Sequence, residues 1–253
     1  MKPKHILFLL AAAIITGCSE KDDNFSEVNF KFIHKWDESI VTSSDLDTIQ
    51  FINESGNELS IERLRYIISN IEINDINGES YLLNNYNLLN LEDESSLNFG
   101  SNQTLKTGTY SNISFIFGLT NDLNIDGAYP DLNSAIWNVP LMLGGGYHYM
   151  QLDGKYISNS GEESGYNYHS IRAIDNPGPN PIFPEDTYFK VDLGPVNIGE
   201  DCKITISMNI ANWFKDPYSW DLNDLNQMLM ANSYAQILMK QNGQNVFNLE
   251  SIE

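Results

Sequence analysis

Cysteine is scarce in this 253-residue chain, which contains only Cys18 and Cys202. Two cysteines cannot form the disulfide framework of many small secreted proteins, so the fold must be held together by a packed core. Enzyme signatures are lacking as well, because the sequence has no G-x-S-x-G, no H-E-x-x-H and no P-loop. We therefore expect a binding protein and no enzymatic activity.

Basic residues are also few. The chain has 14 Lys and Arg against 34 Asp and Glu, which gives a formal net charge of −20. An acidic surface of this kind repels nucleic acid and anionic membranes, and it suits cations or soluble partners. We expect no nucleic acid among the partners.

No long apolar run is present near the N-terminus either. The run Ile6–Ile15 is shorter than the roughly 20 residues that a membrane-spanning helix needs. It ends in the sequence ITGC, with Cys18 last, which resembles the bacterial lipobox. The sequence therefore predicts a signal peptide over residues 1–17, lipidation of Cys18, and a polar tether over residues 18–27.

A lipid anchor would place the protein in the cell envelope. Removal of Lys2 and Lys4 with the signal peptide changes the charge to −20 − 2 = −22. We expect contact with the membrane only through the anchor. The outer membrane is the expected site, and the protein would face either the periplasm or the cell surface.

Alternation of apolar and polar residues dominates the remaining chain. Short runs of this period are separated by Gly, Asn, Asp and Pro, which predicts many antiparallel strands, each with one polar face. We expect one domain over residues 28–253, a mostly β antiparallel β-sandwich with long loops. A helical spacing from Leu222 to Leu238 predicts one C-terminal helix, with Asp221 as N-cap and Gly243 just past its end. The clearest strand runs are Val28–Trp36, Ser111–Leu119, Tyr188–Leu193 and Lys203–Ile210.

Three histidines remain after removal of the signal peptide: His34, His148 and His169. Strand alternation places each on a face with apolar neighbours. His148 would share its face with Met150 and Leu152, and His169 with Ile171 and Ala173. A buried imidazole without a partner costs about 1–3 kcal/mol. The three rings either find separate partners in the core or converge on a metal ion.

The sequence offers two kinds of cation site. Imidazole nitrogen suits copper, zinc and nickel, and a nearby thioether such as that of Met150 would favour Cu(I). Asp122, Asn124 and Asp126 precede a glycine with the spacing of the first half of a calcium loop, but the acidic ligand that should follow is Asn133. Calcium is the weaker of the two hypotheses.

Several segments resemble, in their order, the MbnP-like copper-binding proteins, and in particular a lipoprotein branch of that family in Bacteroidetes. They extend over roughly residues 28–249. After the lipobox, the segments that carry the resemblance are Phe30–His34, Leu64–Asn70, Ser114–Leu119, Gly144–Gly154, Tyr166–His169 and Asn212–Phe214.

The resemblance implies an extracytoplasmic β-sandwich that binds copper for scavenging, storage or delivery. It implies His34, His148 and His169 as ligands from separate strands. It also implies a tryptophan near the metal, which a di-haem peroxidase-like partner oxidises to kynurenine. Trp36 lies two residues after His34, and Trp137 lies in the loop before His148, so both are candidates.

An alternative is a surface binding module for glycans or protein partners with no physiological metal. Exposed tyrosines and tryptophans would then stack on sugar rings. Convergence of the three histidines would favour copper, whereas histidines scattered through separate cores would favour the alternative.

Overall fold

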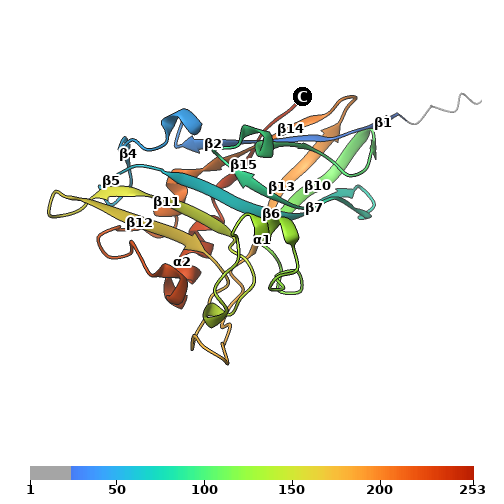
Figure 1. Ribbon diagram of the computed structural model, residues 1–253. Helices are drawn as coiled ribbons and strands as arrows, with labels where there is room; N and C mark the ends of the chain where they lie inside the picture. Colours follow the sequence, from blue (N-terminus) through green and yellow to red (C-terminus); the bar gives the residue numbers. More distant parts are fainter. Residues whose placement is uncertain (1–23) are drawn as a thin grey trace, which may run out of the picture.

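The computed structural model describes residues 24–253 (Figure 1). The predicted signal peptide and the lipidation site Cys18 lie outside these residues. The end of the predicted tether does not behave as a free linker. Phe25–Ser26 form strand β1, which pairs antiparallel with β9, Leu105–Lys106.

The larger sheet has eight strands and is organised around β6, Arg63–Asp75. This strand pairs antiparallel with β7, β10 and β11 at different points along its length. Such extended pairing is favoured by its sequence, in which Ile67, Ile68, Ile71 and Ile73 are buried. The other strands are β4 Phe51–Ile52, β5 Glu58–Leu59, β7 Ser80–Asn90, β10 Gly108–Phe117, β11 Met150–Ile157, β12 Glu163–Ser170 and β13 Phe189–Ile198.

The second sheet has five strands, and its centre is a parallel pair. Strand β2, Asn29–Trp36, runs parallel to β14, Lys203–Asn209, with Phe32 opposite Ile206. All other pairings in the two sheets are antiparallel. The flanking strands are β3 Ser39–Val41, β8 Asn98–Gly100 and β15 Phe247–Ile252.

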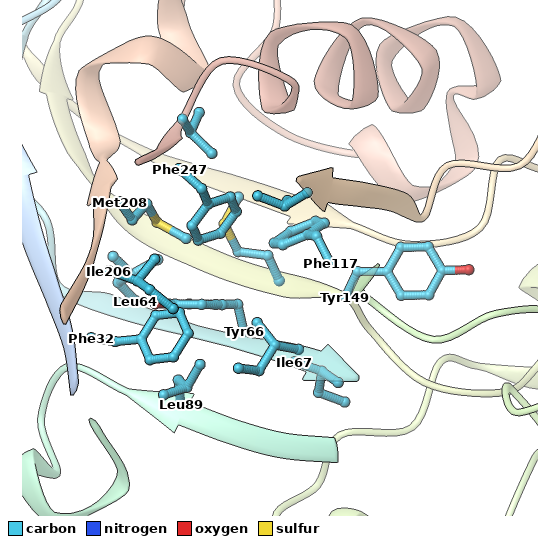
Figure 2. Close-up of a cluster of buried hydrophobic side chains, with 14 of the residues drawn as sticks. Phe32, Leu64, Tyr66, Ile67, Leu89, Phe117, Tyr149, Ile206, Met208 and Phe247 are labelled. Atoms are coloured by element: carbon cyan, nitrogen blue, oxygen red, sulfur yellow. The ribbon is translucent and has the colours of Figure 1, made fainter. Parts of the chain in front are cut away.

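The two sheets enclose a common core that is rich in aromatic rings (Figure 2). Phe117 of β10 is fully buried, and its ring lies 4.8 Å from that of Phe189 and 5.2 Å from that of Trp213. Phe32 from the smaller sheet contacts Tyr66 from the larger one, at 6.5 Å between ring centroids. The predicted mostly β sandwich is therefore confirmed.

The C-terminal helix is confirmed, but it is shorter than the sequence predicts. Helix α2 is Ser233–Gly243 and its N-cap is Asn232, whose side chain accepts a hydrogen bond from the Ala235 amide at 3.1 Å. Asp221 instead accepts from the Asn223 amide in a turn, and Met228 has φ 58°, which no helix tolerates. Leu222 and Leu229 are buried in turns and Met228 is 82% exposed, so the apolar spacing of this segment imitates a helix that is not there.

The remaining helical pieces are short. They are α1 Pro130–Ser134 and the 3₁₀ turns η1 Ser43–Asp45, η2 Glu94–Leu97, η3 Leu141–Leu143, η4 Ile210–Phe214 and η5 Leu229–Ala231. Within residues 24–253, no helix has both the length and the apolar character needed to cross a membrane.

Replacing Phe117 by Ala should lower the free energy of unfolding by about 3–5 kcal/mol, because the side chain is fully buried among four rings. Urea unfolding followed by circular dichroism measures the change. Ile76 is 73% exposed in the turn after β6, and its replacement by Ala should change stability by less than about 0.5 kcal/mol. Equal losses in the two variants would contradict this account of the core.

Candidate metal centre

Three consecutive glycines lie shortly before His148, the first histidine of the site. Gly144, Gly145 and Gly146 all have positive φ, at 91°, 65° and 79°. Three successive left-handed residues are accessible only to glycine without strain. At Gly146 space is limiting as well, because a Cβ would lie 2.5 Å from Asn124 Oδ1.

The Asp122–Asp126 segment holds this glycine loop in place. Asn124 Oδ1 accepts from the Tyr147 amide at 2.7 Å, and Asp126 Oδ1 accepts from the Gly146 amide at 3.1 Å. Two of the three side chains that the sequence offered to calcium, Asn124 and Asp126, thus accept hydrogen bonds from backbone amides. The D-x-N-x-D-G spacing has a structural explanation here, and the residues 24–253 contain no cluster of three or more His, Cys, Asp or Glu placed for a metal ion.

Trp137 and His148 are joined by reciprocal hydrogen bonds. The indole Nε1 of Trp137 donates to the His148 carbonyl at 2.6 Å, while the His148 amide donates to the Trp137 carbonyl at 3.1 Å. The His148 ring adds a third bond, from Nδ1 to the same Trp137 carbonyl at 2.9 Å. The carbonyl can only accept, so this contact places the ring proton on Nδ1 and leaves the lone pair on Nε2.

The Nε2 atom of His148 is buried and has no hydrogen-bond partner. Burial lowers the pKa of His148 to about 4, although the bond to Trp137 opposes the shift. The ring is therefore neutral at pH 7. A buried, unpaired lone pair is costly in an ordinary core and suitable for a metal ligand.

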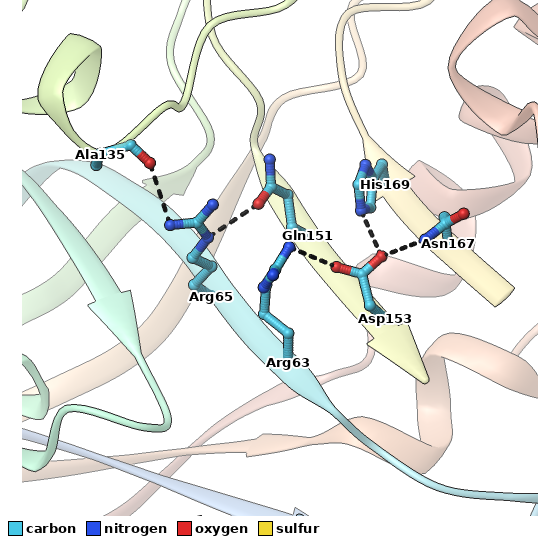
Figure 3. A network of polar contacts seen from close by, with 7 residues as sticks. All are labelled: Arg63, Arg65, Ala135, Gln151, Asp153, Asn167 and His169. Carbon is cyan, nitrogen blue, oxygen red and sulfur yellow. Dashed lines mark hydrogen bonds and ion pairs between the residues drawn. The ribbon is translucent and has the colours of Figure 1, made fainter. Parts of the chain in front are cut away.

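His169 lies beside His148. The two ring centroids are 5.4 Å apart and the ring planes are nearly perpendicular, at 86°. His169 is fixed by Asp153, whose Oδ1 accepts from His169 Nε2 at 2.7 Å (Figure 3). Since the carboxylate can only accept, Nε2 carries a proton, and Nδ1 is the nitrogen of this ring that can serve as a metal ligand.

Asp153 is itself held from two other sides. Its Oδ1 also accepts from Asn167 Nδ2 at 2.6 Å, and its Oδ2 lies 3.2 Å from the Arg63 guanidinium. Burial alone would raise the pKa of Asp153, but the bonds from His169 and Asn167 and the charge of Arg63 outweigh it and lower the pKa. The carboxylate is therefore ionised and available to orient His169. A carboxylate–histidine pair of this kind commonly supports a metal ligand.

Arg65 connects strand β11 with the loop before Trp137 (Figure 3). Its Nε donates to Gln151 Oε1 at 2.9 Å, and its terminal nitrogen donates to the Ala135 carbonyl at 3.2 Å. The guanidinium carbon lies 4.9 Å from the centre of the Trp137 ring, a cation–π contact. Gln151 is the register partner of both Arg65 and His169, so strands β6, β11 and β12 all contribute to one face.

The structure does not bring His34 to this site. His34 contacts Tyr66, with Nε2 3.2 Å from the hydroxyl. Tyr66 and Arg65 are adjacent on β6, so they point to opposite faces of the sheet. His34 therefore lies on the core side, and His148 and His169 lie on the other side. The resemblance implies all three histidines as ligands of one metal ion, but only the rings of His148 and His169 are neighbours in the structure.

Two of the predicted neighbours of the metal also lie in the core. The ring of Trp36 is 4.8 Å from that of Phe51 and 5.9 Å from that of Phe214. Met150 is fully buried and opposite Tyr66 in the register. The thioether that favoured Cu(I) is thus on the wrong face of β11, whereas Trp137 is confirmed as a neighbour of His148, at 5.7 Å between ring centroids.

The face assignments of the two converging histidines are also corrected. His148 precedes β11, where the irregular backbone breaks the alternation, so it does not share a face with Met150 and Leu152. His169 shares the more exposed face of β12 with Asn167, because the strand ends at Ser170 before Ile171 and Ala173. The alternation of side chains does not continue past the ends of these two strands.

No short motif marks the residues that support the paired histidines, which are Arg63, Arg65, Gln151, Asp153 and Asn167. Their polar side chains alternate with buried residues on three strands, which was a usable signal. The strand register that brings these side chains together is not visible in the sequence. Their placement depends on long-range pairing that no short segment encodes.

The fold and the site together define a class: a mostly β sandwich protein with a paired-histidine site on the outer face of its larger sheet. A sequence profile described as MbnP matches residues 25–233, and the chain therefore belongs to the MbnP family.

Among solved structures, MbnP from Methylosinus trichosporium is similar in fold, with a TM-score of 0.52 and 13% sequence identity. The match covers 79% of this chain and 80% of that one. No curated protein matches this chain.

Acid should destabilise the protein through His34. Burial lowers its pKa from 6.5 to about 4, so the unfolded chain binds a proton between these values and the folded protein does not. The titration of His34 leaves the free energy of unfolding unchanged above about pH 6.5, and it lowers this free energy by roughly 3 kcal/mol between pH 6.5 and pH 4. His34→Gln should remove this part of the pH dependence in urea unfolding of metal-free protein. Parallel stability curves for the two proteins would contradict a neutral buried His34.

Proposed function

We propose that this protein binds copper outside the cytoplasm, holding the ion between His148 and His169, and that it serves in copper scavenging, storage or delivery. The observation that carries the proposal is the buried, unpaired Nε2 of His148 next to the ring of His169. Membership of the MbnP family supports copper as the metal.

The donor set fits the metal. Both rings have one nitrogen bound to a protein acceptor, Trp137 O for His148 and Asp153 Oδ1 for His169. Each ring thereby keeps one nitrogen for a ligand, His148 Nε2 and His169 Nδ1. Neutral imidazole nitrogen suits copper, and the outer partners fix the orientation of each ring.

The surroundings favour retention of the ion over catalysis. His148 is 5% exposed, and the His169 side chain is 15% exposed. Arg65 and Trp137 close the site on one side, and the described residues offer no paired nucleophile and base at this position. We propose a binding protein and not an enzyme. The Met150 thioether, which was the reason to favour Cu(I), lies on the other face of β11 and takes no part in the proposed site.

Trp137 is the tryptophan that we propose for the modification implied by the family resemblance. It contacts His148 and is fully buried, whereas Trp36 lies in the core among phenylalanines. A di-haem peroxidase-like partner would act on it. Intact-mass analysis of protein from its native host would report the conversion to kynurenine.

The glycan-binding alternative loses the tryptophans of its proposed platform and the tyrosines near the paired histidines, although Tyr218 and Tyr234 are exposed elsewhere. All four tryptophans are buried: Trp36 is 8% exposed, and Trp137, Trp213 and Trp220 are at most 1% exposed. Tyrosines near the paired histidines are equally inaccessible, since Tyr147, Tyr149 and Tyr168 are fully buried. Rings that are covered in this way cannot stack on a sugar.

We further propose that Cys18 is lipidated and anchors the protein in the outer membrane. Cys18→Ser should move the protein from the membrane fraction to the soluble envelope fraction, because the anchor would be its only membrane contact. Fractionation with an antibody gives the readout. Retention of the variant in the membrane fraction would contradict the anchor.

His148→Ala and His169→Ala should each abolish copper binding, because a single imidazole is left. The proteins are expressed in the periplasm with copper, and bound metal is measured by mass spectrometry. His34→Gln is the matched control and should retain the copper, since His34 lies on the other side of the sheet. Unchanged copper content in both site variants would overturn the assignment.

A milder change tests the supporting carboxylate. Asp153→Asn keeps the shape of the side chain but removes the charge that orients His169, and it should weaken copper binding by about 10–100-fold. A competition titration against a chromogenic chelator measures the affinity. An affinity equal to that of the wild type would show that Asp153 has no part in the site.

A further inference from the structure

Arg65 lies in the same row of the larger sheet as one of the paired histidines. In the register of β6, β11 and β12, Gln151 is opposite both Arg65 and His169, so the three side chains share one face. Two strand spacings of about 4.8 Å place the backbone of Arg65 on the order of 10 Å from that of His169. Figure 3 shows the Arg65 side chain on this face, next to Gln151.

The guanidinium of Arg65 is held in position by neutral groups. It donates hydrogen bonds to the side-chain oxygen of Gln151 at 2.9 Å and to the Ala135 carbonyl at 3.2 Å, and it lies 4.9 Å from the centre of the Trp137 ring. None of these three groups is an anion, so they orient the guanidinium without cancelling its charge. A guanidinium remains protonated in proteins, so this charge does not depend on pH in the working range.

The charge of Arg65 acts on the proposed ligands. The Trp137 ring that Arg65 contacts is 5.7 Å from the ring of His148. Burial is the main reason for the low pKa of His148, and the charge of Arg65 also lowers it. The guanidinium is therefore within electrostatic range of an ion held by His148.

The other charges near the site do not cancel that of Arg65. Asp153, which orients His169, is itself paired with Arg63 at 3.2 Å. Two guanidiniums and one carboxylate leave an excess of one positive charge. Glu92 also attracts Arg65, but it is exposed, so solvent and salt screen its charge. Imidazoles that bind a metal ion are neutral and add no negative charge.

We propose that Arg65 is a specificity-determining residue of the paired-histidine site, where its positive charge favours a monovalent ion such as Cu(I) over a divalent ion such as Zn(II). The proposal rests on the copper binding proposed above. Coulomb repulsion is proportional to the charge of the ion, so it disfavours the divalent ion twice as strongly. Cu(I) and Zn(II) are both d¹⁰ ions that imidazole binds, so the comparison between them isolates the effect of charge.

The test is the ratio of the Zn(II) affinity to the Cu(I) affinity, each measured by competition with a chromogenic chelator. Arg65→Met removes the charge and keeps an unbranched side chain. Its ratio should rise about tenfold, as expected for the loss of one charge on the order of 10 Å from the ion. A purely structural loss would weaken the binding of both ions together and leave the ratio unchanged.

Three further variants complete the comparison. Arg65→Lys keeps the charge without the planar fork, and its ratio should equal that of the wild type. Lys190→Met removes a charge from β13, which β10 and β6 separate from β11, and as the matched control it should leave the ratio unchanged. Arg65→Gln is a second neutral variant, in case Arg65→Met does not fold. An unchanged ratio in a folded neutral variant, or an equal rise in Arg65→Lys, would overturn the proposal.

The reduction potential of bound copper gives a second readout. A tenfold change in the preference for Cu(I) over Cu(II) corresponds to about 59 mV for one electron. Arg65→Met should therefore lower the potential by about this amount, because loss of the positive charge stabilises Cu(II) relative to Cu(I). A potential equal to that of the wild type would contradict the role of Arg65.

The copper content of His169→Ala separates this proposal from the proposed function. If that variant retains its copper, the paired-histidine site is wrong and the role of Arg65 is overturned with it. If the variant loses its copper while Arg65→Met keeps the wild-type ratio, only the role of Arg65 is overturned.

Discussion

The alternation of side chains along β6 is the constraint on which the rest of the structure depends. Tyr66 points into the core and meets rings from both sheets, while Arg65, one residue earlier, points outward to Gln151 and Trp137. One strand thereby separates two environments, first the aromatic core on one face of the sheet and second the polar site on the other face. His34 belongs to the first environment, and His148 and His169 belong to the second.

Much of the architecture could be predicted because the strands are regular. Phe30, Phe32 and Trp36 face inward as their spacing requires, and so do Ile204 and Ile206. The C-terminal helix was predicted too long because Leu222 and Leu229 are buried by turns and not by a helical stripe. Apolar spacing indicates burial along regular strands, but in this segment it identifies neither the backbone conformation nor the exposure of Met228.

The site was harder to predict, for physical reasons that differ between its residues. His148 follows three left-handed glycines, so no strand period applies to it. His169 lies one residue before the end of β12, where alternation with the next segment stops. Asp153 reaches His169 only because Asp153 is paired with Asn167 and Gln151 with His169 in the register of β11 and β12. The family resemblance named His148 and His169, which lie side by side, and it also named His34, which the topology places on the other side of the sheet.

The burial of every tryptophan has a spectroscopic consequence. Indoles removed from water emit at shorter wavelength than exposed ones, so the folded chain should have a blue-shifted emission that reports its tertiary packing. Of the four, Trp137 has its ring 5.7 Å from that of His148 and beneath the guanidinium of Arg65. Part of the tryptophan emission thus originates beside the paired histidines and depends on their surroundings.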